Sequence, residues 1–265
     1  MTSTPSHPGP LSARGLSRET TGRGLQTCLR FTLALLTIAA LSGCQSISMN
    51  SAQLRVIDAS PDSGIIDSYQ NSSALAYNLG FGTMTSYVPI VPGSSTLVAA
   101  KAGTRQTLVA NSDTLLPGQQ YTEIIGSSLV NLQQAVFLDQ STPAPSGQVA
   151  LRFIHEASRS AAVDVYLVPK SGRLTTTSPL AIDLNFGNNS GYINIPEGTY
   201  AINVVPTGTL PTPSTVTLLN GAQVAYPSGA VRTIVLIDQE ISGTQHAALT
   251  RGMQVIVADD ADAQD

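Results

Sequence analysis

The chain has 265 residues and a formal net charge of −4, because 13 Lys and Arg residues stand against 17 Asp and Glu residues. Charged residues make up 11% of the chain, compared with about 25% in a typical globular domain. No nucleic acid is expected as a partner, since binding to phosphates needs clustered Lys and Arg side chains.

Residues 1–43 have the features of a signal peptide. Four arginines and one glutamate come before an apolar run of residues 31–41, which is too short to span a bilayer but fits a signal-peptide core. Leu41, Ser42, Gly43 and Cys44 follow, and these four residues resemble the bacterial lipobox. The resemblance implies cleavage before Cys44 and a covalent lipid on its thiol.

A lipid on Cys44 predicts an exported protein anchored to its membrane, since several acyl chains bind a bilayer far better than one. Gln45, rather than Asp, follows the cysteine, and by analogy this favours the outer membrane, on its periplasmic or surface side. No other cofactor is expected. An unmodified, buried Cys44 after an ordinary signal peptide is the alternative.

Residues 44–53 form the lipidated cysteine and a polar, Ser-rich spacer, and residues 54–140 are predicted to form a first domain. Candidate strands near 86–91, 96–100, 105–110, 121–125 and 135–138 are separated by Pro and Gly at the spacing expected of a β-sandwich. No window has the pattern of a long amphipathic helix. With Cys28 removed and Cys44 lipidated, no disulfide is expected.

The opening of this domain, LRVIDASPDSGIIDSY at residues 54–69, is matched by LRFIHEASRSAAVDVY at residues 151–166. Leu, Arg, Ile, Ser, Asp and Tyr recur at one spacing, which indicates a duplicated unit of roughly a hundred residues. Alternating apolar residues predict two strands joined by a turn in each copy. Arg55 with Asp67, and Arg152 with Asp164, are expected to form an ion pair within each copy.

This pattern resembles the opening motif of the domain-of-unknown-function 4397 family, which has a hydrophobic strand, a His-Ala-Ser-Pro-Asp-like turn and a Val-Asp-Val-Tyr-like strand. The first copy keeps the Ala-Ser-Pro-Asp turn at residues 59–62, with Asp58 in place of the family's His. The second copy keeps His155 and the strand at residues 163–166. The resemblance covers most of the chain after about residue 52 and implies an exported, β-sandwich-like surface domain.

The second domain is predicted at residues 149–258, after a Pro-rich linker at 141–148. An insertion near residues 173–179 is expected to lengthen one of its loops. The run TIVLI at residues 233–237 lacks alternation and predicts a central strand buried on both faces. A last strand at 253–257 comes before an acidic tail at 259–265, which is expected to be solvated. The predicted fold is therefore all-β, with two tandem immunoglobulin-like antiparallel β-sandwich domains.

Two sets of residues are candidates for a binding site. Asp58, Ser60 and Asp62 resemble the first three ligand positions of a calcium loop, but Gly64 comes one place late, so a turn held by hydrogen bonds is favoured over a weak calcium site. Tyr69, Tyr166 and His155 could form a binding surface, although tyrosines that cover the sandwich edge are the favoured interpretation. No histidine-based metal site is expected, because His155 and His246 are the only histidines after residue 43.

No catalytic residue is assigned. His155, Ser158 and Asp164 are the residue types of a nucleophilic triad, but the chain has no Gly-x-Ser-x-Gly motif. The predicted function is a lipid-anchored envelope protein with a non-enzymatic structural or adhesive role. Its expected partners are the membrane and an envelope protein or glycan. A binding module for a glycan or small solute is the alternative, and an exported hydrolase is a remote one.

Overall fold

The computed structural model describes residues 51–240 and 252–261. The predicted signal peptide (1–43), Leu41, Ser42, Gly43, Cys44, most of the spacer and the end of the chain lie outside the described residues. The described part is almost entirely β-structure, with two short 3₁₀ turns, η1 (Leu129–Asn131) and η2 (Leu174–Thr176). None of its helical segments is long and apolar enough to cross a bilayer.

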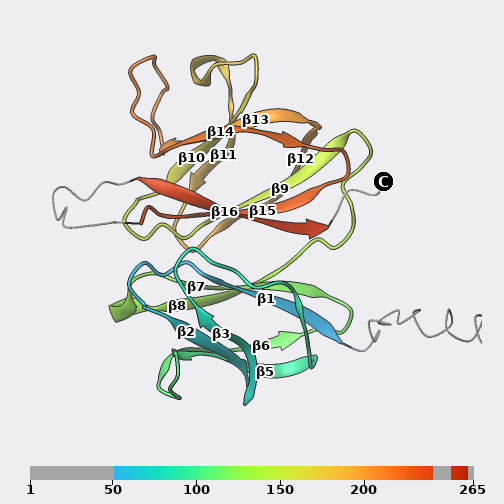
Figure 1. The fold of residues 1–265 in the computed structure, drawn as a ribbon. Helices are drawn as coiled ribbons and strands as arrows, with labels where there is room; N and C mark the ends of the chain where they lie inside the picture. Colours follow the sequence, from blue (N-terminus) through green and yellow to red (C-terminus); the bar gives the residue numbers. More distant parts are fainter. Residues whose placement is uncertain (1–50, 241–251, 262–265) are drawn as a thin grey trace, which may run out of the picture. The chain divides into compact units, whose positions relative to one another are not determined.

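The N-terminal half, residues 51–138, consists of two four-stranded sheets in the orders β4-β1-β7-β8 and β3-β2-β5-β6 (Figure 1). The strands of this half are β1 (Ala52–Asp58), β2 (Ile66–Gln70), β3 (Ser73–Leu79), β4 (Val88–Ile90), β5 (Gly93–Lys101), β6 (Thr107–Leu115), β7 (Gln120–Gly126) and β8 (Gln133–Leu138).

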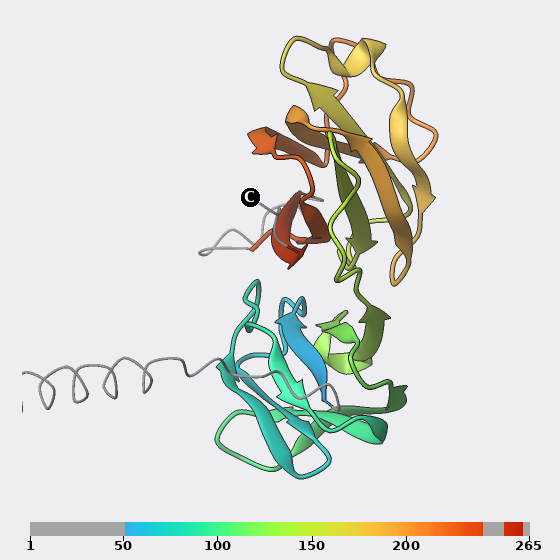
Figure 2. The ribbon, with the colours of Figure 1, turned by 90° about the vertical axis from the view of Figure 1, so that its right-hand side faces the viewer.

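The C-terminal half, residues 148–240 and 252–261, has the same strand order, with sheets β12-β9-β15-β16 and β11-β10-β13-β14. Figure 2 shows its strands in two layers. The strands are β9 (Gln148–His155), β10 (Val163–Pro169), β11 (Pro179–Leu184), β12 (Asn189–Pro196), β13 (Gly198–Pro206), β14 (Leu219–Tyr226), β15 (Val231–Asp238) and β16 (Met253–Ala261). The predicted all-β, immunoglobulin-like sandwich fold is confirmed.

One pairing in each half differs from the predicted antiparallel sheets. β1 pairs with β7, and β9 with β15, in parallel, whereas the other strand ladders are antiparallel. β1 and β9 therefore lie inside their sheets, with neighbours on both sides. This position agrees with their almost complete burial.

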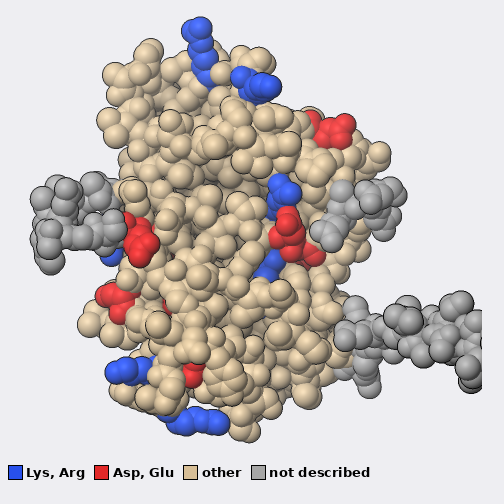
Figure 3. Space-filling view, viewed as in Figure 1, with Lys and Arg blue, Asp and Glu red and all other residues tan. Residues whose placement is uncertain are grey.

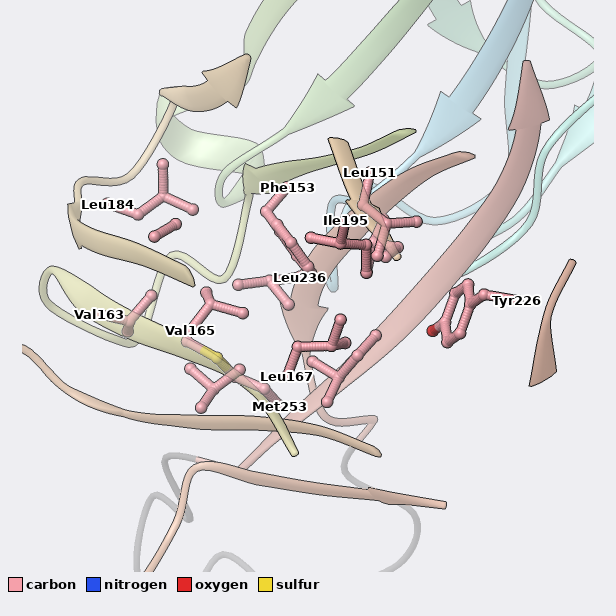
Figure 4. Close-up of a cluster of buried hydrophobic side chains, with 14 of the residues drawn as sticks. Leu151, Phe153, Val163, Val165, Leu167, Leu184, Ile195, Tyr226, Leu236 and Met253 are labelled. Carbon is pink, nitrogen blue, oxygen red and sulfur yellow. The ribbon is translucent and has the colours of Figure 1, made fainter. Parts of the chain in front are cut away.

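The cores consist of apolar side chains at alternate positions of the strands, which point to the inside of each sandwich. In the C-terminal half, Val149, Leu151 and Phe153 of β9 point toward Val163 and Val165 of β10 and form a single apolar cluster. Figure 4 shows ten labelled members of this cluster converging from both sheets. The N-terminal half has two smaller clusters, one around Leu54 and Leu97 and one around Val56 and Ile66.

Strand β15 is buried on both faces, as its sequence predicts. Ile234 and Leu236 belong to the core of the C-terminal half, whereas Val235 and Ile237 pack in a second cluster with Ile57 and Ile124 of the N-terminal half. The burial on the second face thus comes from contact between the halves.

Four edge strands and the end of the chain differ from the prediction. β3, β11, β12 and β14 are not among the predicted strands, and all four are edge strands whose residues are mostly exposed or half-buried. The apolar alternation that would identify a strand is therefore weak in them. The acidic tail was expected to begin at residue 259, but β16 continues to Ala261, so Asp259 and Asp260 are part of a sheet.

Candidate functional site

Asp58 and His155 close β1 and β9 and make equivalent local contacts. Oδ1 of Asp58 accepts a hydrogen bond of 2.9 Å from the Ser60 amide, and Nδ1 of His155 accepts one of 3.2 Å from the Ala157 amide. The other ring nitrogen of His155 lies 3.1 Å from the Ala161 carbonyl oxygen and donates to it. Both side chains are fully buried. His155 is thus a turn residue and does not belong to a surface.

The three oxygen ligands of the possible calcium loop do not converge. Asp62 accepts a hydrogen bond of 2.7 Å from the Leu129 amide, while Asp58 holds Ser60 and Ser63. The Ser60 hydroxyl is buried without a hydrogen-bond partner. Among residues 51–240 and 252–261, no three His, Cys, Asp or Glu side chains are grouped as for a metal ion.

The residue types of a catalytic triad are also held apart. The Ser158 hydroxyl donates to Asp238 at 2.9 Å, and Asp164 accepts bonds from Thr207 and from the Asp183 and Gly208 amides. Both nitrogens of His155 are engaged by the backbone. Ser158, His155 and Asp164 therefore form no proton-transfer chain.

The predicted pairs Arg55/Asp67 and Arg152/Asp164 are wrong. Arg55 forms an ion pair with Asp260, and Arg152 forms one with Asp139, so the closest carboxylate of each arginine comes from the other half of the chain. Arg55 also lies 3.7 Å from Asp139. Asp67 and Asp164 lie in β2 and β10, in the opposite sheet of each sandwich.

The two arginine sites mirror each other atom by atom. Nε of Arg55 donates to Thr122, and Nε of Arg152 to Thr233, at 2.9 and 3.1 Å. The rings of Tyr87 and Tyr192 cover the guanidinium groups at 4.7 and 4.6 Å. Their hydroxyls donate to Asp139 and Asp260 at 2.7 and 2.8 Å. We call these eight residues the exchange network (Arg55, Tyr87, Thr122, Asp139, Arg152, Tyr192, Thr233 and Asp260).

Burial changes the acidity of several groups near this network. Desolvation raises the pKa of Asp58 to about 7, against hydrogen bonds from Ser60 and Ser63. It raises the pKa of Glu123 to about 7, against bonds from Gln134 and Ser68. It raises the pKa of Glu156 to about 8.

In the exchange network every charged side chain has a partner of opposite charge, and both carboxylates accept several hydrogen bonds. The network is therefore a structural interface rather than a site for a ligand.

An open hollow of about 500 Å³ lies on the outer side of the β3-β2-β5-β6 sheet. Asp67 and Tyr69 come from β2, Tyr77 and Asn78 from β3, and Gly103, Thr104 and Arg105 from the β5–β6 turn. On β2, Ile66 and Ser68 face inward, so the period of two places Asp67 and Tyr69 on the outer face.

The aromatic wall of the hollow is a pair of tyrosines. Tyr69 and Tyr77 meet edge to face, with ring centroids 6.2 Å apart and planes at 86°. Tyr69 is buried, whereas Tyr77 is 65% exposed. Arg105 is exposed and lies over the Tyr69 ring, with its Cζ 4.8 Å from the centroid. Tyr77 therefore offers an open apolar surface beside a cation.

Asp67 forms the base of the hollow and holds its three segments together. Its carboxylate accepts hydrogen bonds from the amides of Asn78, at 2.9 Å, and Gly103, at 3.0 Å. Both residues have left-handed backbone, with φ of 55° and 69°. In the C-terminal half, Asp164 accepts the same two bonds from Asp183 and Gly208. This aspartate is structural in both halves.

The rest of the hollow is specific to the N-terminal half. Ile182 stands at the place of Tyr77, and Leu210 at the place of Arg105. Tyr166, the counterpart of Tyr69, is buried and packs with Val168, Val205 and Leu174. Leu174 lies in η2, within the segment predicted as an insertion, which covers the outer face here. Tyr166 is therefore not part of an open binding surface.

The sequence indicated Tyr69 but missed Tyr77 and Arg105. Tyr77 lies in β3, an edge strand that the sequence pattern does not predict, and Arg105 lies in the β5–β6 turn, although the sequence predicts a strand that begins there. One signal was available, because Lys101 and Arg105 place two basic residues within five positions in a chain with 13 in all. Figure 3 shows how sparse charge is on the face that it displays.

Comparisons with known proteins find a family model that matches part of the chain and solved structures with low TM-scores. Residues 52–166 match the model of a family described as "Domain of unknown function (DUF4397)". A comparison with curated proteins finds no relative.

Among solved structures, one described as "Alpha-glucan binding by a streptococcal virulence factor" is 10% identical, covering 69% of this chain and 92% of its own, with a TM-score of 0.25. A Bacteroides fragilis protein described as a candidate cell adhesion protein is 9% identical, covering 80% and 99%, with a TM-score of 0.16. At such TM-scores neither likeness indicates a shared function.

Proposed function

We propose that the protein is a non-enzymatic, adhesive protein of the cell envelope that binds carbohydrate in the hollow. Residues 52–166 match the model of the DUF4397 family, whose description assigns no activity, so the proposal starts from the hollow. The observation that carries this proposal is the exposed ring of Tyr77, fixed edge-on by Tyr69 and flanked by Thr104 and Arg105. An aromatic ring offers a flat apolar surface for the C–H face of a sugar. The hydroxyl and guanidinium groups beside it supply hydrogen bonds to sugar hydroxyls.

The chemistry of the hollow favours binding over catalysis. Its one carboxylate, Asp67, already accepts bonds from Asn78, Gly103 and Tyr69, and glycoside hydrolysis needs two free carboxyl groups. The open form of the hollow also fits a long polymer that extends beyond it, as an adhesive contact requires.

Replacement of Tyr77 tests the proposal. Tyr77→Ile introduces the residue that stands at the equivalent place in the C-terminal half, so the fold should tolerate it. On a glycan array and by calorimetry, we expect binding to weaken by at least tenfold. Ile182→Ala is the matched control, an exposed residue changed at the equivalent place, and it should bind as the wild type does. Equal binding by Tyr77→Ile and wild type would exclude the hollow as the site.

The envelope location rests on the N-terminal sequence, and we propose that Cys44 carries the lipid anchor at the outer membrane. Cells that express the wild type should incorporate a fatty-acid probe into the protein, and Cys44→Ser should not. Equal labelling of the two proteins would reject the anchor without affecting the proposed sugar site.

A further inference from the structure

We infer that the sugar bound in the hollow is acidic and that its carboxylate is held by the guanidinium of Arg105. This inference rests on the proposed carbohydrate binding and narrows it to one class of ligand, the glycans that carry uronic or other carboxylated sugars.

The Arg105 side chain has a defined position, but its N–H donors are free to bind a ligand. The Tyr69 ring lies under its guanidinium, with Cζ 4.8 Å from the centroid, so the side chain has a defined place despite its exposure. Among the described residues the guanidinium forms neither an ion pair nor a hydrogen bond. A guanidinium over an aromatic ring keeps the N–H donors at its rim available, and two of them match the oxygens of a carboxylate.

Three other arginines also lie against tyrosine rings, but each of them has a carboxylate partner. Arg55 and Arg152 also lie against tyrosine rings, but each is buried and already holds an aspartate. Arg232 contacts Tyr226 and pairs with Asp259. Arg105 repeats the arrangement of arginine over tyrosine with the carboxylate position open to solvent.

The accessible charge of the hollow is positive. Asp67 is the one acidic residue in its lining, and it is buried with its oxygens turned to the Asn78 and Gly103 amides. Lys101, at the end of β5, adds a second exposed cation to the same turn. The whole chain carries a net charge of −4, whereas this turn carries two positive charges. An anion would therefore be attracted to the turn.

The C-terminal half provides an internal comparison. At the same place it has Leu210 and Ile182, and no basic residue follows Gly208 in the turn. The structural aspartate is kept in both halves, whereas the cation and the exposed ring occur together in one. The pair Tyr77 and Arg105 thus has no role in the shared fold that would account for it.

The test compares oligosaccharides of hexuronic acid with the same oligosaccharides after reduction of their carboxylates to alcohols. Polyglutamate, which has carboxylates but no sugar ring, is a third probe. The full mature protein should bind the uronate at least tenfold more tightly than either of the others. Arg105→Gln should bind uronate and reduced sugar about equally, and Arg105→Lys should keep part of the preference, since it keeps the charge but not the two-pronged geometry.

Lys101→Gln is the matched control, because it removes the same charge from the same turn without the tyrosine contact. It should keep the preference of the wild type to within about threefold, in line with the small effect of an exposed charge. All variants should share the unfolding midpoint of the wild type, since both side chains are exposed.

Each outcome separates the two proposals. If the wild type binds uronate and reduced sugar equally, or if polyglutamate binds as tightly as uronate, the acidic-sugar inference is overturned while the sugar site stands. A preference that Arg105→Gln leaves intact also overturns it. If no oligosaccharide binds to the wild type, or if Tyr77→Ile binds as tightly as the wild type, the proposed function itself fails.

Discussion

Asp58 and His155 show how two unlike residues can fill one place. Each accepts a hydrogen bond from the amide two residues later, so the carboxylate oxygen and the imidazole nitrogen do the same work for the backbone. Desolvation lowers the pKa of His155, which keeps the ring neutral and Nδ1 free to accept. The difference between the copies is explained by this shared role and implies no chemistry.

Glu156 gives a prediction about pH. Its folded pKa is about 8 and its ordinary value is 4.5, so folding favours the protonated form. The stability it contributes is complete below about pH 4.5 and is lost as pH rises through 8. We expect Glu156→Gln, which stays neutral, to raise the free energy of unfolding by about 3–5 kcal/mol at pH 9 and by less than about 1 kcal/mol at pH 4.

Urea denaturation at the two pH values measures this difference. Asp58 and Glu123 titrate over an overlapping range, so the variant should keep part of the pH dependence of the wild type. Glu197→Gln controls for the loss of a carboxylate elsewhere. The same gain at pH 4 as at pH 9 would contradict the assignment to Glu156.

At the scale of single residues, the sequence indicated one residue of the hollow but not the residues that lie beside it in space. Tyr69 was identified from the repeat, whereas Tyr77 and Arg105 join it from β3 and from the β5–β6 turn. His155 and Tyr166, in the second copy of the repeat, were grouped with Tyr69 as a possible binding surface, but both are buried. Repetition in sequence therefore marked the shared framework, and the difference between the copies marked the candidate site.

Among the elements, the strands with two neighbours were predicted well, whereas the edge strands β3, β11, β12 and β14 were missed. β5, β7 and β15 have buried residues that give strong apolar patterns. β3 and β14 bond to one neighbour and face solvent along much of their length, so their sequences carry little pattern. β16 was cut short because its last residues are acidic, and their partners lie far away in the sequence.

We expect the structural aspartates to stabilise the fold by holding the ends of neighbouring strands together. Asp164 ties β10 to the residue before the end of β11 and to the turn after β13, through Asp183, Thr207 and Gly208. We expect Asp164→Ala to lower the free energy of unfolding by about 2–3 kcal/mol, because the two amides and the Thr207 hydroxyl lose their charged acceptor. Asp62→Ala removes an exposed carboxylate with one amide partner and should cost about 1 kcal/mol or less. Equal losses in thermal unfolding would contradict this role.

Across the whole molecule, the exchange network joins the two halves. Arg55 of β1 holds Asp260 of β16, and Arg152 of β9 holds Asp139, the residue after β8. The cluster of Ile57, Ile124, Val235 and Ile237 adds apolar contact to these pairs. No local sequence pattern could have predicted the ion pairs of the network, since their partners are separated by 13 residues in one pair and 205 in the other.

We expect Asp260→Ala to lower the free energy of unfolding by about 3–5 kcal/mol, because the buried Arg55 loses its closest carboxylate and keeps only Asp139, at 3.7 Å. Asp259→Ala is the neighbouring control and breaks an exposed pair with Arg232, worth less than about 1 kcal/mol. Urea unfolding of the wild type should show one transition, and Asp260→Ala should separate it into two. A single transition with an unchanged midpoint in Asp260→Ala would show that the network does not couple the halves.

The parallel pairing of β1 with β7 has a mechanical consequence. A pull on the chain at residue 51 acts along β1, and the register from Gln53/Gln120 to Asp58/Ile125 opposes it. The evenly spaced bonds of this ladder are loaded together in shear and cannot open one after another like a zip. The first strand is thus arranged to transmit tension from its N-terminal end into the sandwich that carries the hollow.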